Sequence, residues 1–269
     1  MFRDASRFGQ SLQKTLASLQ VTERPQTGCA VETIARVDYI CGPVPAPKKD
    51  LREKVVPILL AAGPSGPLPF PKALAKFGAK TALQIAIENC AGYGRPILVL
   101  GCHASRIRAA VPAAIRVLIN RNWRAGQLSS LLAALRLVPR GASILVYPVD
   151  HPLLTRAVVR RLCRAATGRA SAGKIVLPTF RGRVGHPVIF APEIRQELEA
   201  ASTAREVVYR DLRRAKFVKV KCPGIWLDFN SPASYRRCQR DYAKQSKRQP
   251  TARARSAGRS RGQPQPARR

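Results

Sequence analysis

The chain has 269 residues and a formal net charge of +33. No run approaches the roughly 20 apolar residues that a membrane-spanning helix needs, so we expect no membrane partner. The seven cysteines show no CxxC spacing, which argues against a zinc site or a disulfide framework. The N-terminus lacks the apolar segment of a secretory signal, so we expect a cytoplasmic protein.

Both ends of the chain differ from its middle. Leucines at helical spacing predict a short helix over residues 11–21, within a poorly patterned N-terminal extension, residues 1–53. Residues 244–269 are polar and single-signed in charge, which predicts a disordered basic tail that binds nucleic acid non-specifically at low salt. The folded domain should therefore occupy residues 54–243.

Strand and helix patterns alternate through this middle region. Aliphatic runs predict strands at residues 55–62, 96–101, 116–120, 143–149, 174–179, 186–190 and 217–221. Helical patterns lie at residues 79–92, 104–111, 128–138, 155–166, 193–201, 204–214 and 232–243. The alternation predicts right-handed βαβ units and a mainly parallel, doubly wound α/β sheet. Ligands of such sheets bind beyond the carboxyl ends of the strands, where Gly63, Asn120 and Asp150 lie.

The loop after the first predicted strand is the most informative segment. Residues 60–72 read Leu-Ala-Ala-Gly-Pro-Ser-Gly-Pro-Leu-Pro-Phe-Pro-Lys. Glycines without a Cβ let backbone amides approach a polyphosphate, and Lys72 can supply positive charge. No Gly-Lys-Ser/Thr follows the glycines, so the loop is not a P-loop.

A carboxylate follows the strand at residues 143–149. Asp150 stands between Pro148 and Pro152, at the edge where we expect the loop. Magnesium takes few protein ligands and completes its octahedron with water and phosphate oxygens, so one aspartate there is a suitable anchor for Mg²⁺. Asn230 and Ser231 are expected only to cap the helix that Pro232 opens.

Two further segments have substrate-binding character. In residues 120–131, Asn-Arg-Asn-Trp-Arg-Ala-Gly-Gln-Leu-Ser-Ser-Leu, Gly126 permits a sharp turn into a helix. The hydroxyls of Ser129 and Ser130 then lie near that helix's N-terminus, a favourable place for an anion or a base carbonyl. In residues 181–190, Arg-Gly-Arg-Val-Gly-His-Pro-Val-Ile-Phe, the two arginines can receive an anionic acceptor on a flexible glycine-containing loop.

These segments resemble, in order, the motifs of the MobA-like nucleotidyltransferases, which include molybdenum cofactor cytidylyl- and guanylyltransferases. The family patterns are Leu-Ala-Ala-Gly-x-Ser-x-Arg-Met-Gly-x-x-Lys, Asn-Pro-x-Trp-x-x-Gly-x-x-Ser-Ser-Leu, Asp-x-Pro, Gly-x-x-Gly-His-Pro-Val-x-Phe and Asp-x-Asp/Asn-Thr-Pro-Glu-Asp. The last resembles residues 228–234, and the whole resemblance covers residues 57–235. Pro67 replaces the loop arginine, which usually contacts the leaving pyrophosphate, and Pro69 replaces a glycine.

The resemblance implies a three-layer, Rossmann-like nucleotidyltransferase fold of the GT-A type. It implies that Mg²⁺ assists transfer of a nucleoside monophosphate from an NTP, with CTP or GTP favoured, to a phosphate-bearing acceptor such as molybdopterin. Pyrophosphate is released. Asp150 and Lys72 would be catalytic, and Asp150 with Asp228 would hold the metal.

The resemblance also implies two sets of binding residues. The nucleotide would be bound by Leu60, Ala61, Ala62, Gly63, Ser65, Lys72, Asn120 and Ser130. The acceptor would be bound by Arg183, Gly185 and His186. Because Pro67 removes an arginine, we expect a nearby basic residue such as Lys76, Arg95 or Arg183 to replace it.

Two other functions remain open. Since Pro67 and Pro69 remove backbone donors from the loop, the chain could be a catalytically impaired nucleotide-binding or interaction protein on the same fold. The net charge also allows a charge-driven nucleic-acid-binding protein, although no aromatic residues interleave the arginines of the tail.

Overall fold

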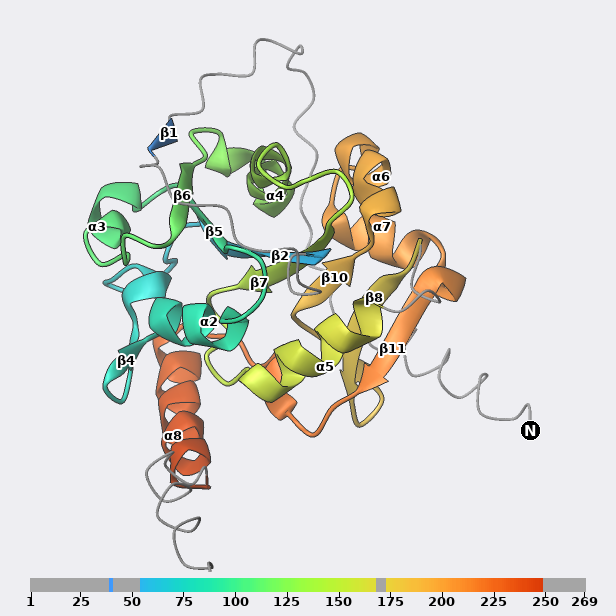
Figure 1. Cartoon of the computed structure of the whole chain (residues 1–269). Helices are drawn as coiled ribbons and strands as arrows, with labels where there is room; N and C mark the ends of the chain where they lie inside the picture. The colour runs from blue at the N-terminus through green and yellow to red at the C-terminus, as the bar shows by residue number, and fades with distance from the viewer. Residues whose placement is uncertain (1–38, 41–53, 168–172, 249–269) are drawn as a thin grey trace, which may run out of the picture.

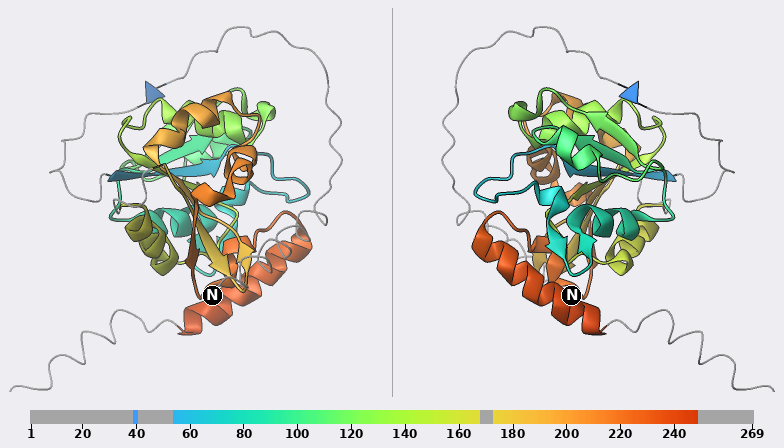
Figure 2. Two further views of the ribbon diagram at one scale, coloured as in Figure 1. Left: turned by 90° about the vertical axis from the view of Figure 1, so that its right-hand side faces the viewer. Right: turned by 90° about the vertical axis from the view of Figure 1, so that its left-hand side faces the viewer.

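The computed structural model describes residues 39–40, 54–167 and 173–248 (Figure 1). Within them, a nine-stranded sheet lies between two layers of helices (Figure 2). This mainly parallel three-layer architecture confirms the predicted fold class. The predicted helix over residues 11–21 lies outside the described residues.

Six strands of the sheet run in the same direction. In spatial order they are β6 (Arg116–Ile119), β5 (Ile97–Leu100), β2 (Val55–Ala61), β7 (Ser143–Pro148), β8 (Ile175–Phe180) and β11 (Ala215–Lys219). The buried pattern of β2 on both faces explains its central place, since only a strand covered on two sides can be apolar throughout. Its alternate residues enter different cores: Leu59 and Ala61 pack in one, Ile58 and Leu60 in the other.

One central strand runs against this direction. β10 (Val188–Phe190) lies between β7 and β8 and is antiparallel to both. The reversal begins in a two-residue hairpin, where Arg181 and Gly182 adopt positive φ between β8 and β9 (Arg183–Val184). Because β10 is reversed, its first end lies at the edge where the parallel strands finish. His186 therefore joins that edge.

The helices divide between the two faces of the sheet (Figure 1). Helices α2 (Ala82–Cys90) and α5 (Arg156–Ala166) pack over one face, and α3 (Ala104–Arg108) adds Ile107 to the same core. The other face is covered by α4 (Gln127–Leu135), α6 (Arg195–Ala200) and α7 (Ala204–Arg210). Thr155 caps α5, because its hydroxyl accepts from the Val158 amide.

A third apolar cluster lies beside the sheet. The hairpin of β3 (Lys76–Phe77) and β4 (Lys80–Thr81) packs against α8 (Pro232–Arg248), where the ring centroids of Phe77 and Tyr235 lie 5.4 Å apart. The composition predicts disorder from residue 244, and this boundary is wrong. α8 continues to Arg248, since Lys, Gln and Arg are good helix formers and Gln245 donates to the Leu153 carbonyl at 3.4 Å.

The predicted extension also contributes two residues to the sheet. β1 (Tyr39–Ile40) pairs antiparallel with β6 at the sheet edge, so the boundary at residue 54 misses this strand. Of the helices that the structure describes, none combines the length and apolar character needed to cross a membrane.

Candidate functional site

The loop after β2 presents free backbone donors. Among the described residues, nothing accepts from the amides of Gly63, Ser65 and Gly66. The Leu68 amide donates to the Ser65 carbonyl at 3.3 Å, and Gly66 turns the chain with φ +58°. Leu68 is buried in the third cluster, which anchors the loop. The loop is thus held open with its amides available to an anion.

A first cavity of about 470 Å³ lies beneath this loop, at the carboxyl ends of the strands. Its volume is in the range of small-ligand pockets. Of the predicted site residues, it is lined by Leu60, Ala61, Ala62, Gly63, Lys72, Ser130 and Asp150. The fold therefore brings together residues that are distant in the sequence.

Ser65 and Asn120 do not line the first cavity but support its walls. The Ser65 hydroxyl lies 3.0 Å from Nε2 of His103, and His103 itself lines the cavity. The buried Asn120 donates to the hydroxyls of Ser129 and Ser130 at 2.9 and 3.0 Å. Both residues are positioning groups in this structure.

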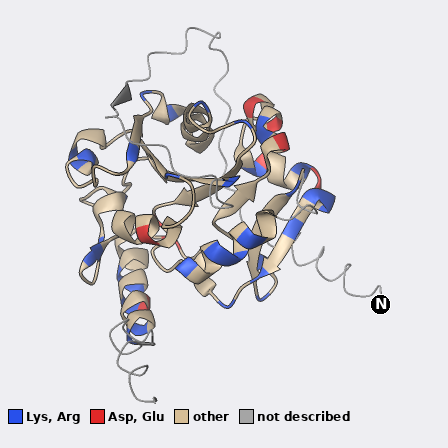
Figure 3. Ribbon diagram, viewed as in Figure 1, with Lys and Arg blue, Asp and Glu red and all other residues tan. Residues whose placement is uncertain are grey.

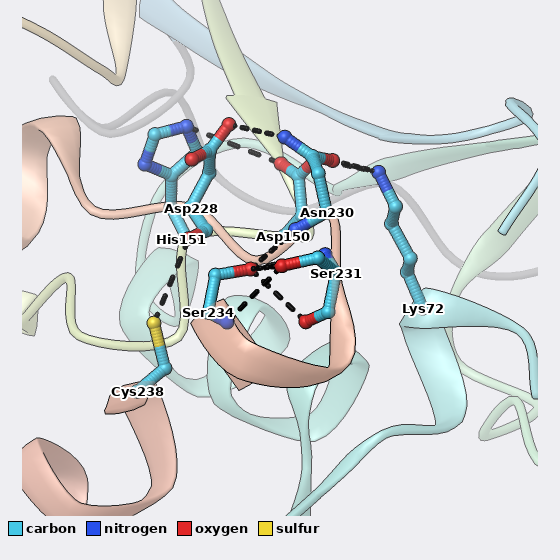
Figure 4. A network of polar contacts seen from close by, with 8 residues as sticks. All are labelled: Lys72, Asp150, His151, Asp228, Asn230, Ser231, Ser234 and Cys238. Carbon is cyan, nitrogen blue, oxygen red and sulfur yellow. Dashed lines mark hydrogen bonds and ion pairs between the residues drawn. The ribbon is translucent and has the colours of Figure 1, made fainter. Parts of the chain in front are cut away.

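A network of polar side chains lies between β2, β7 and α8 and forms the floor of the candidate site (Figure 4). Lys72, in the 3₁₀ turn Lys72–Leu74, lies with its Nζ 3.4 Å from Oδ2 of Asp150. The same Nζ donates to Oδ1 of Asn230. Asn230 in turn donates through Nδ2 to Oδ2 of Asp228 at 2.6 Å. One amide therefore links the lysine to the second carboxylate.

This network corrects the expectation for Asn230. Its side chain does not cap α8 but faces the two site carboxylates. Ser231 does cap α8, because its hydroxyl accepts from the Ser234 amide at 3.2 Å. The motif near residue 230 thus divides into one site residue and one cap, and their spacing alone could not distinguish them.

Two histidines extend the floor. Nε2 of the buried His151 lies 4.0 Å from Oδ1 of Asp150, and its ring centroid is 4.9 Å from that of His186. Burial, reinforced by the neighbouring His151, lowers the pKa of His186 to about 3. His186 is therefore neutral at physiological pH and cannot supply charge to a ligand.

A second cavity of about 550 Å³ lies on the other side of these histidines. The predicted acceptor residues Arg183, Gly185 and His186 all line it. Sequence reasoning missed other contributors, among them Arg205 and Tyr209 of α7. Their i, i+4 spacing on a predicted helix indicated one shared face, but not that this face meets β10.

Arginine–aromatic pairs flank the second cavity. The Arg183 guanidinium lies 4.3 Å from the centre of the Trp226 ring, and the Arg205 guanidinium 5.3 Å from that of Tyr209. Between them the floor is apolar, formed by Val146, Leu177, Val188 and Phe190. Such walls suit a partly apolar ligand that carries negative charge.

The sequence predicts that Gly185 serves a flexible loop, but the structure gives this residue a different role. A Cβ at this position would lie 2.1 Å from the Ile225 carbonyl oxygen. The next amide, that of His186, donates to the same oxygen at 2.6 Å. Gly185 is required because two backbones pack closely here.

The donor set of the floor fits a hard divalent cation. No group of three or more His, Cys, Asp or Glu side chains converges within the described part of the chain. Asp150 and Asp228 nevertheless supply carboxylate oxygens on either side of Asn230 (Figure 4). Magnesium needs few protein ligands when phosphate and water provide the others, so this pair fits Mg²⁺ in kind.

None of the three expected substitutes for the lost loop arginine lines the first cavity. Arg95 donates to the Ala114 carbonyl beside the start of β5, at the opposite edge of the sheet. Lys76 is exposed on β3, and Arg183 lines the second cavity. Among the described residues, the arginine that does line the first cavity is Arg124.

Similarity to known proteins establishes the family of this chain. Residues 57–220 match the family model of the MobA-like NTP transferase domain. The chain belongs to this family. It is 34% identical over 148 residues to nicotine blue oxidoreductase of Paenarthrobacter nicotinovorans, covering 52% of this chain and 72% of that protein.

Several solved structures share the fold of this chain. Rv0371c from Mycobacterium tuberculosis H37Rv is 27% identical, with a TM-score of 0.60 over 70% of this chain and 98% of that one. A complex of the same protein with manganese is 26% identical, with a TM-score of 0.58 over the same shares. A nucleotidyl transferase from Methanothermobacter thermautotroptrophicus shares the fold at 19% identity, with a TM-score of 0.63 over 71% and 99%.

Proposed function

We propose that this member of the MobA-like family transfers a nucleoside monophosphate from an NTP, with CTP or GTP favoured, to a phosphate-bearing acceptor such as molybdopterin. The observation that carries the proposal is the position of Asp150. It lines the first cavity, while its neighbour His151 and the linked Asp228 line the second. A nucleotide and an acceptor could therefore meet beside one carboxylate.

In the proposed reaction, an acceptor phosphate oxygen attacks the α-phosphorus in line. The new P–O bond forms as the bond to the β-phosphate bridging oxygen breaks, and the electron pair leaves with pyrophosphate. The attacking oxygen is already ionised, so no general base is required. A bound Mg²⁺ would offset charge on the phosphates.

The chain's own groups would act by positioning and by charge. Of the three loop amides without an acceptor among the described residues, that of Gly63 belongs to a residue that lines the first cavity, and it would donate to a phosphate oxygen. Lys72 would neutralise the phosphates from the 3.4 Å position beside Asp150. Asp150 and Asp228 would hold the cation.

The experiment is pyrophosphate release. Purified protein is incubated with Mg²⁺, each of the four NTPs, and either molybdopterin or a sugar 1-phosphate. The proposal predicts acceptor-dependent pyrophosphate with one NTP preferred, and none from Asp150→Ala. Nucleotide binding without pyrophosphate from either acceptor would favour the impaired nucleotide-binding protein, which Pro67 and Pro69 also favour.

A redox reaction is a second candidate, because a 34% identical relative is named an oxidoreductase. No cysteine lines either cavity in the described part of the chain, so electrons would have to come from an external carrier. A thermal-shift screen that sets NTPs beside nicotinamide dinucleotides separates the two. A larger shift with the dinucleotides would favour the redox reaction.

A further inference from the structure

The first cavity has an uneven distribution of positive charge. Two of its lining side chains, Lys72 and Arg124, are basic. Lys72 already contacts Asp150 and Asn230, so the carboxylate offsets its charge. Within the described residues, Arg124 makes no ion pair. Its charge is therefore available to a ligand.

The segment that carries Arg124 is firmly placed. Arg124 belongs to the 3₁₀ turn Trp123–Ala125, and its guanidinium lies 4.6 Å from the centre of the Trp123 ring. Trp123 packs so closely on Gly101 that a Cβ there would lie 2.7 Å from the Trp123 Cβ. The arginine thus projects from a fixed wall, and stacking on the ring limits the rotamers it must lose on binding.

The loop opposite lacks the equivalent charge. Pro67 stands where the resemblance places an arginine, and it is exposed and does not line the cavity. The free amides of the loop donate hydrogen bonds but bring no net charge. A triphosphate bound there would meet one compensated lysine and one uncompensated arginine.

We propose that Arg124 binds the outer phosphates of the NTP and supplies the charge that the loop has lost at Pro67. This inference rests on the proposed function, since it assumes that the first cavity holds a triphosphate. A guanidinium can contact two phosphate oxygens at once, which makes it suited to a leaving pyrophosphate.

The test compares ligands that differ only in phosphates. Isothermal titration calorimetry with Mg²⁺ measures binding of the preferred NTP, its monophosphate and inorganic pyrophosphate. Arg124→Ala should weaken the binding of NTP and of pyrophosphate by about 10- to 100-fold and leave the binding of the monophosphate unchanged. The affinity of Arg124→Lys for NTP and for pyrophosphate should lie between that of the wild type and that of Arg124→Ala. Arg108→Ala, an exposed arginine on α3 that lines neither cavity, should match wild type.

A folding effect is separated by Arg124→Met, which keeps an apolar stem on Trp123 and should show the same loss with an unchanged melting temperature. NTP binding unchanged by both substitutions would overturn the inference, and so would an equal loss of NTP and monophosphate. Absence of NTP binding by the wild type would instead overturn the proposed function, and this inference with it.

Discussion

The first cavity is walled by backbone amides and charged side chains, whereas the second has an apolar floor between two arginine–aromatic pairs. The first is built from loops that follow parallel strands. The second depends on the reversed strand β10 and on α7. Gln127 lines both, so they adjoin. Under the proposed function, the first cavity would hold the polyphosphate and the second the partly apolar, anionic acceptor.

Charge around the molecule does not follow this division. Lysines and arginines are distributed over most elements (Figure 3), and α5 carries the exposed arginines Arg156, Arg160, Arg161 and Arg164. Positive charge is therefore a poor guide to either cavity. The local pairing of each cation, as at Lys72 with Asp150, is more informative.

The largest effect on turnover should come from Asp150, which lies between the two cavities. Asp150→Asn keeps the shape of the side chain but removes its charge, so turnover should fall by about 100- to 1000-fold. Asp241→Asn on α8, which lines neither cavity, is the matched control. Initial rates of pyrophosphate release measure the effect. Equal turnover of the two variants would remove Asp150 from the mechanism.

The next largest effect should come from a substitution that alters the second cavity and leaves the first intact. Gly185→Ala places a Cβ 2.1 Å from the Ile225 carbonyl oxygen, so unfolding free energy should fall by about 1 to 3 kcal/mol. The acceptor KM should rise while NTP affinity is kept. Gly141→Ala, where a Cβ meets nothing within 4 Å, is the control for urea unfolding. Comparable stability of the two variants would contradict the close packing described here.

The histidines of the second cavity predict a pH dependence. The folded-state pKa of His186 is about 3, below the unfolded value of 6.5, so the unfolded chain binds more protons between these limits. Stability from neutral His186 is present above pH 6.5 and is lost as pH falls toward 3, by at most about 1.4 kcal/mol per pH unit. Urea unfolding from pH 4 to 7 should show a smaller slope in His186→Gln. An unaltered slope would mean that His186 is not the group responsible.

The smallest effect sharpens the comparison. Arg205→Ala removes one arginine–aromatic pair from the second cavity, so the acceptor KM should rise by about 10-fold. NTP affinity should not change, because Arg205 does not line the first cavity. Steady-state kinetics with each substrate varied in turn distinguishes these effects. A raised NTP KM would show that the cavities are not separate in the way proposed.

Much of the first cavity was predictable from the sequence. An apolar strand followed by glycines predicts an open loop, and a strand that ends in aspartate predicts a carboxylate at the same edge. The second cavity was harder to predict from the sequence. Arg183, Gly185 and His186 were expected there, but Arg205, Tyr209 and Trp226 were not, because they converge through long-range packing.

The sequence by itself determined the alternation of strands and helices, the mainly parallel sheet and the cluster of site residues at its carboxyl edge, since periodicity and turn chemistry are local. Only the tertiary structure decided that β10 is reversed, that Asn230 joins Lys72 to Asp228, and that Arg124 rather than Arg95 lines the first cavity. Strand direction and side-chain partners depend on contacts between segments distant along the chain, and residue spacing does not encode those contacts.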